Sequence, residues 1–74
     1  MEYIFVHFDE NDVRDVIANG DVLGRSENTL MLAAGYYEIT LSGVGFQPRK
    51  WEGAIAATDP AAPLGLLFTR KTSR

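Results

Sequence analysis

Residues 30–46 read LMLAAGYYEITLSGVGF, and they carry the clearest structural signal in the chain. In the middle of this stretch Tyr37, Ile39 and Leu41 fall on one side of an extended strand. The residues that fall on the other side are Tyr36, Glu38, Thr40 and Ser42. A period of two with one apolar face is typical of a half-buried strand. Because glycines at positions 35, 43 and 45 bound this alternation, we predict a strand over residues 36–42.

The composition allows one small domain that folds without covalent cross-links. The chain has 74 residues, which is the length of a single domain, and 46% of them are apolar. It contains no cysteine, so disulfides and thiolate chemistry are excluded. The net charge of −3 argues against nucleic acid as a partner, since phosphate binding needs a basic surface.

The N-terminal sequence MEYIF has an acidic residue where a secretion signal would carry basic ones. No apolar stretch is long enough to cross a membrane. We therefore expect a cytoplasmic chain with no membrane partner. A fragment of an exported protein would give the same pattern.

Other short segments also have the character of strands. Residues 2–8 have apolar side chains on both faces, which predicts a strand that is central or covered on both sides. Three further strands are predicted over residues 29–32, 49–57 and 64–69, with loops over residues 24–28, 43–48 and 59–63. We expect one domain over residues 1–69 and a basic, disordered tail over residues 70–74.

Residues 12–20 allow two interpretations. Val13, Val16 and Ile17 have helical spacing, and Gly20 could cap a short helix. However, these three residues are β-branched, and the Asn19-Gly20 pair is the strongest short signal for a hairpin turn. We favour a hairpin over residues 13–23 with its turn at Asn19-Gly20, and the helix is the alternative.

The strand lengths and turn spacing together predict the fold class. We expect an all-β protein, a small antiparallel β-sandwich of about six to seven short strands. The alternation within each strand also predicts the core. Its members are Ile4, Val6, Phe8, Leu30, Leu32, Tyr37, Ile39, Leu41, Ile55 and Leu67.

Residues 16–46 resemble the PEGA domain. The matching positions are Asn19-Gly20, Gly24, Leu30, Leu32, Gly35-Tyr36-Tyr37, Ile39, Leu41 and Gly45-Phe46. Arg25-Ser26 stands where the family often has Thr-Pro, and residues 32–35 replace its Pro-Glu-Gly-Ala sequence. The resemblance implies a small β-sandwich related to carboxypeptidase regulatory domains. It also implies a non-catalytic accessory module, usually attached to other domains of bacterial proteins.

The sequence offers no convincing catalytic, metal or cofactor site. His7 is the only histidine, and the candidate nucleophiles Ser26, Ser42 and Ser73 lack an activating context such as GxSxG. The acidic turn at residues 9–12 resembles the start of a calcium loop, but Arg14 and Gly20 stand where that loop needs glycine and glutamate. The GxG at residues 43–45 lacks the third glycine of a phosphate cradle. We therefore predict no enzyme, no cofactor and no metal, and expect His7 to be a packed residue.

Two kinds of partner remain. The first is protein, because a small sandwich of bacterial or phage type exposes edge strands that can pair with another chain or with a second copy. The alternative is a carbohydrate or other small ligand on an aromatic surface formed by Tyr36, Trp51 and Phe46. For Trp51 we predict that the indole lies flat over Gly53 and closes one end of the core. If the strand instead turns outward there, the indole forms a stacking platform near Tyr36.

Overall fold

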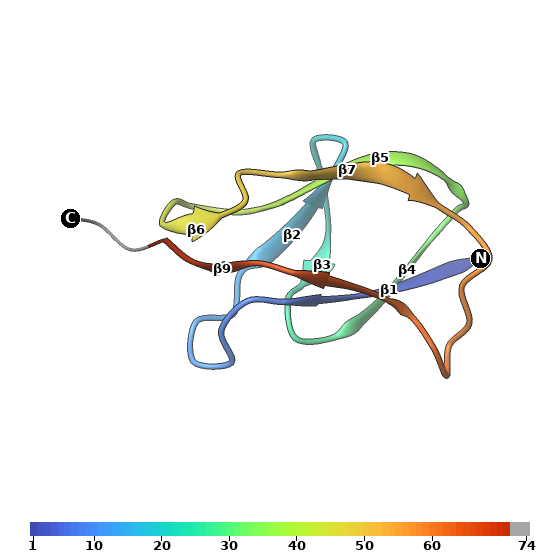
Figure 1. Ribbon diagram of the computed structural model, residues 1–74, viewed down its shortest axis with the longest axis horizontal. Coiled ribbons are helices and arrows are strands. Elements are labelled where there is room, and N and C mark those ends of the chain that lie inside the picture. The colour runs from blue at the N-terminus through green and yellow to red at the C-terminus, as the bar shows by residue number, and fades with distance from the viewer. Residues whose placement is uncertain (72–74) are drawn as a thin grey trace.

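The computed structural model describes residues 1–71, which form nine strands and no helix (Figure 1). The strands are β1 Glu2–His7, β2 Asp15–Ala18, β3 Asp21–Arg25, β4 Thr29–Leu32, β5 Gly35–Leu41, β6 Phe46–Gln47, β7 Trp51–Ile55, β8 Leu64–Leu67 and β9 Thr69–Arg70. The prediction of an all-β protein is confirmed. The hairpin is also confirmed, and the alternative helix over residues 12–20 does not form.

The strands form two larger sheets, with orders β4-β1-β8 and β3-β2-β5-β7, and a small sheet that pairs β6 with β9. In Figure 1, β5 and β7 run along the top of the view and β1 along the bottom, and the core lies between them. This arrangement is of the β-sandwich type that the sequence predicted. One pairing differs, because β1 and β8 are parallel and not antiparallel.

The connection between β7 and β8 explains the parallel pairing. It leaves one sheet at Ile55, crosses over at the end of the molecule where the N-terminus lies, and enters the other sheet at Leu64 (Figure 1). β8 therefore starts at the same end as β1 and runs in the same direction. Thr58 ties it to β1: its hydroxyl and amide donate to Oε1 of Glu2 at 2.6 and 2.8 Å, and its hydroxyl accepts from the amide of Tyr3 at 2.7 Å. These hydrogen bonds lower the pKa of the Glu2 carboxyl.

The turn at Asn19-Gly20 has the backbone that its sequence predicts. Both residues have positive φ, 49° and 87°, as a type I′ turn requires. The Asn19 side chain also fastens the turn to β5, because its Oδ1 accepts the amide of Glu38 at 2.9 Å. In return, the amide of Asn19 donates to the Glu38 carbonyl at 3.0 Å. The turn therefore forms part of the sheet.

The core fills the space between the two larger sheets. It consists of Ile4, Val6, Phe8, Val16, Ala18, Leu32, Ile39, Leu41, Ile55, Leu66 and Phe68. The predicted faces of the central strand are confirmed, since Ile39 and Leu41 are buried and Tyr37 packs against them. Leu30 packs partly against the core. The placement of Leu67 in the core was wrong, because its side chain is 64% exposed.

Several boundaries differ from the prediction. Gly24 and Arg25 continue β3, whereas the sequence predicted a loop there. The glycine-rich connection at residues 43–48 contains β6, and the peptide bond before Pro48 is cis. Arg70 pairs with Phe46 in β9, so the prediction that Arg70 belongs to a disordered tail was wrong. Residues 72–74 of the predicted tail lie outside the described residues.

Candidate functional site

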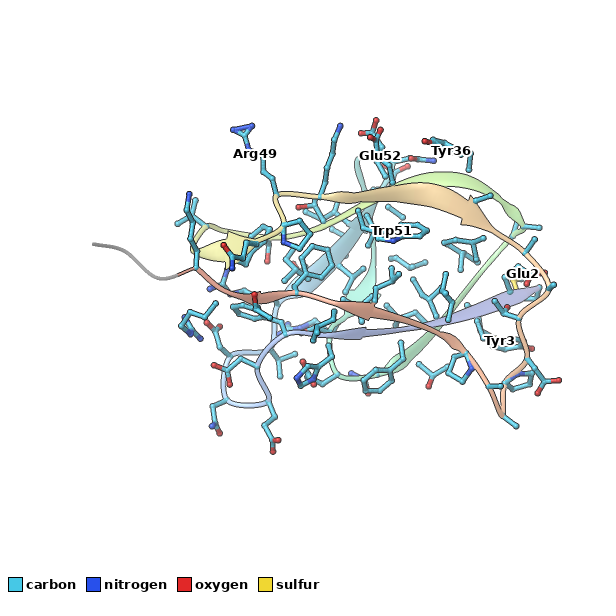
Figure 2. All side chains as sticks on the ribbon, in the orientation of Figure 1. Glu2, Tyr3, Tyr36, Arg49, Trp51 and Glu52 are labelled. Carbon is cyan, nitrogen blue, oxygen red and sulfur yellow. The ribbon has the colours of Figure 1, made fainter. Side chains whose placement is uncertain are left out.

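Tyr36, Trp51 and Phe46, the aromatic residues predicted to share a surface, lie in three different places. Tyr36 is 67% exposed on the outer face of β5. Trp51 lies on the opposite, inner face of the same sheet, where it pairs in register with Ile39 (Figure 2). A flat ligand therefore cannot stack on both rings at once.

The indole of Trp51 covers the backbone of its own strand. A Cβ atom placed on Gly53 would lie 2.9 Å from both Cη2 and Cζ2 of the indole, closer than van der Waals contact allows. Glycine at position 53 therefore makes room for the ring, as predicted from the sequence. Trp51 is half-buried and packs against the core.

Phe46 belongs to the interior of the end of the sandwich near β6 and β9. Its ring meets Phe8 and Phe68 edge to face, with centroids 6.3 and 5.8 Å apart. The guanidinium of Arg14 lies over Phe8, 5.0 Å from the ring centroid, and 6.0 Å from that of Phe46. The predicted aromatic surface is thus not assembled, and the carbohydrate alternative loses its geometric basis.

His7 and the candidate nucleophilic serines occupy structural positions. The prediction that His7 is packed was wrong, because its side chain is exposed at the end of β1. It is hydrogen-bonded, with its Nδ1 2.8 Å from Oε1 of Glu27. The other carboxylate oxygen of Glu27 accepts the amide of Phe8 at 2.6 Å. The hydroxyl oxygens of Ser26 and Ser42 both accept backbone amides, while Ser73 lies outside the described residues. No histidine–serine contact is present within residues 1–71.

The acidic turn at residues 9–12 is neutralised by arginine. Asp12 accepts two hydrogen bonds from Arg14, at 2.9 and 3.0 Å, and a third from Arg70 at 3.1 Å. Arg70 also donates to Asp9 at 2.7 Å. These contacts lower the pKa of the Asp9 carboxyl, mainly through Arg70. They lower the pKa of Asp12 from 3.8 to about 2, mainly through Arg14 and then Arg70.

We expect the thermal stability to fall in acid because of Asp12. A carboxyl whose pKa is depressed by folding stabilises the native state fully above its unfolded pKa of 3.8, and this contribution is lost as the pH falls to about 2. The variant Asp12→Asn should have a lower melting temperature at neutral pH than the wild type. Its melting temperature should also fall less steeply between pH 3.8 and about pH 2. Asp21→Asn is the control, since Asp21 is exposed and forms no ion pair within residues 1–71. An unchanged decline in Asp12→Asn would contradict the assignment.

The two sheets have four edge strands, and three of them are obstructed. β3 and β4 lie against each other, since a Cβ atom on Gly24 would be 2.6 Å from Cδ2 of Leu30. β7 carries Glu52, and Lys50 beside it lies 3.3 Å from Glu38 and 3.7 Å from Glu52. Charged side chains of this kind protect an edge from pairing with another strand. The fourth edge strand, β8, reads LGLL and has no charged residue.

The backbone of β8 presents unpaired groups along its outer side. The amide of Phe68 donates to the His7 carbonyl at 2.8 Å, which fixes the direction in which alternate peptide groups point. The backbone groups of Leu64 and Leu66 face β1, so those of Gly65 and Leu67 face away from the sheet. Among residues 1–71 these outer groups have no partner strand.

An apolar face lies beside this open edge, on the outer side of the β4-β1-β8 sheet. Register places Met31 next to Tyr3, and Gly65 next to Phe5. A Cβ atom on Gly65 would have no atom within 4 Å, so the space next to Phe5 is open. β1 is therefore central, as predicted, but within the described chain its second face is not covered. We name Gly65, Leu67 and the neighbouring outer side chains of Tyr3, Phe5 and Met31 the β8 surface. His7, which pairs in register with Leu67, forms its polar end.

Comparisons with known proteins do not assign a function. No protein-family model, curated protein or solved structure matches this chain. In the described part of the chain there is no helix of the length and apolarity needed to cross a membrane. Residues 1–71 also contain no cluster of three side chains that could hold a metal ion.

Proposed function

We propose that this chain is a non-catalytic protein-interaction module that self-associates by pairing β8 with β8 of a second copy. The observation that carries the proposal is the edge of β8, which has unpaired backbone groups and none of the charges, prolines or bulges that protect edge strands. Antiparallel pairing would satisfy the outward groups of Gly65 and Leu67 with the same groups of the second copy.

The chemistry of β8 favours a second copy as the partner. A two-fold axis perpendicular to the sheet brings identical strands together, so any charge on β8 would meet a like charge nearby. β8 carries none. The same axis keeps the outer faces of both sheets on one side. The exposed side chains of Leu67 would then meet across the junction and bury apolar area.

The resemblance to the PEGA domain remains a prediction and is part of the proposal. It implies an accessory module attached to other domains, and self-association would then join the larger proteins that carry it. The bacterial or phage origin that the sequence suggested is a proposal of the same kind. No chemical step is assigned to any residue.

The test is self-association before and after a charge is placed on the edge. The wild-type chain should dimerise reversibly at concentrations of about 1 mM or below in sedimentation velocity experiments. Leu67→Lys should raise the dimer dissociation constant at least about tenfold, because the new ammonium group lies beside its symmetry mate. The Leu67 side chain is 64% exposed, so the fold should tolerate the change.

The control is Val22→Lys on the obstructed edge strand β3. Val22 is 65% exposed, which matches Leu67, so the same charge is introduced at a position of equal exposure. It should leave the dissociation constant within about twofold of wild type. A wild-type chain that is strictly monomeric at millimolar concentration would overturn self-association. Equal effects of the two substitutions would exclude β8 as the interface.

A further inference from the structure

A pocket of about 210 Å³ lies at the end of the sandwich near β6 and β9, away from the β8 surface. Its lining residues are Gly43, Val44, Gly45, Phe46, Arg49 and Lys71. Figure 2 shows Arg49 projecting from the chain just before β7, at this end of the molecule. The pocket thus combines a glycine-containing loop with two cationic residues.

The carbonyl groups of the loop are engaged by the protein itself. Nη1 of Arg14 donates to the carbonyls of Ser42 and Val44, at 2.9 and 3.0 Å. The carbonyl of Gly45 accepts the amide of Lys71 at 2.9 Å. These contacts hold the carbonyls of Ser42 and Val44 toward Arg14. Since the N–H of a trans peptide points away from its carbonyl, the N–H groups of Gly43 and Gly45 point away from Arg14.

The amide groups of the same loop are not engaged. Within residues 1–71, the N–H groups of Gly43, Val44 and Gly45 donate to no acceptor. Gly43 and Gly45 have φ values of +82° and +89°, while Val44 between them has negative φ. Successive backbone N–H groups in turns of this kind form anion-binding concavities.

Within residues 1–71, the two cationic residues of the pocket, Arg49 and Lys71, lack the ion pairs that the adjacent cations Lys50 and Arg70 form. Arg49 and Lys71 form no ion pair with any carboxylate in the described residues. By contrast, Lys50 lies 3.3 Å from Glu38, and Arg70 lies 2.7 Å from Asp9. Two uncompensated positive charges therefore line one pocket of a chain whose net charge is −3.

We propose that this pocket binds a small oxyanion, the phosphate or carboxylate group of a ligand. The amides of Gly43, Val44 and Gly45 would donate to its oxygens, and Arg49 and Lys71 would supply the charge. Guanidinium groups suit this role because their donors match the spacing of two oxygens on one anion. The site is independent of self-association at β8, since no residue of β8, or of β1 that pairs with it, lines the pocket.

The test is a titration of the isotopically labelled chain by nuclear magnetic resonance. Inorganic phosphate and acetate are added separately, at constant ionic strength maintained with sodium chloride. The amide protons of Gly43, Val44 and Gly45 should move downfield and saturate, with a dissociation constant of about 1 mM. The anion that saturates the shift at lower concentration identifies the ligand as a phosphate or a carboxylate. No saturable shift with either anion would overturn the proposal.

Two matched variants separate a site from a general charge effect. Arg49→Gln should weaken binding about tenfold, whereas Lys50→Gln should change it less than about twofold. Both remove one positive charge from adjacent positions, but only Arg49 lines the pocket. The fold should tolerate Arg49→Gln, because Arg49 is exposed and the hydrogen bond from the Thr40 hydroxyl goes to its backbone carbonyl. Equal weakening by both variants would show that no specific site exists.

Discussion

Phe68→Ala should lower the free energy of unfolding by about 3–5 kcal/mol, the range for removal of a buried aromatic ring. Phe68 is 1% exposed and is the largest of the fully buried side chains. Its ring meets Phe46 at 5.8 Å, so its loss would leave a cavity and remove the contact that positions Phe46. Since small domains have total stabilities of about 5–15 kcal/mol, the variant should be close to unfolding at room temperature.

Leu67→Ala is the control for this experiment. Leu67 adjoins Phe68 in the chain, but its side chain is 64% exposed, so its truncation should cost less than about 0.5 kcal/mol in the monomer. Urea denaturation at low protein concentration measures both variants without a contribution from self-association. If Leu67→Ala were the more damaging change, the face assigned to β8 would be reversed.

Ser26→Ala should lower the free energy of unfolding by about 1–3 kcal/mol, although it removes a single oxygen atom. Ser26 is fully buried in the corner between β3 and β4. Its hydroxyl accepts the amide of Arg14 at 2.9 Å, and its own amide donates to the Arg14 carbonyl at 2.8 Å. Without the hydroxyl, the Arg14 amide would lose its acceptor at a fully buried position. A hydrogen bond is costly to lose where one of its groups is left without a partner.

Ser42→Ala is the matched comparison. The hydroxyl of Ser42 also accepts a backbone amide, that of Asp15 at 3.1 Å, but Ser42 is only half-buried. Water can replace its oxygen, so we expect a loss below about 1 kcal/mol. Chemical denaturation of both variants measures the difference. Equal losses would mean that burial does not set the cost at Ser26.

Sequence patterns predicted the candidate site only in part. The sequence predicted that some strands would lie at exposed sheet edges. It did not indicate that β8 would be such a strand, because the strand order of the sheets cannot be read from the sequence. The separate predictions for two of the aromatic residues agree with the structure: Tyr36 is exposed, and Trp51 covers Gly53. The prediction that Tyr36, Trp51 and Phe46 share one surface was wrong. Tyr36 and Trp51 lie in adjacent, paired strands but point to opposite faces of the sheet.

The sequence by itself determined the local features of this protein. Alternation over residues 36–42 specified a strand and its buried face, because side chains project to opposite sides with a period of two. The Asn19-Gly20 pair specified the hairpin, because its backbone adopts the positive φ angles of the turn without a large steric cost. Glycine at position 53 likewise made room for the indole of Trp51.

Only the tertiary structure decided which segments meet and, in strands without a clear alternation, which face is buried. The run LGLLF is apolar at both parities, so its own period does not choose between Leu67 and Phe68. Pairing of Val6 with Leu66 makes that choice, and it depends on a strand about 60 residues away in the chain. The same long-range pairing leaves β8 at an open edge. The β6–β9 pairing likewise brings Lys71 to the pocket that Arg49 lines, because partners distant in sequence are selected by the packing of the whole core.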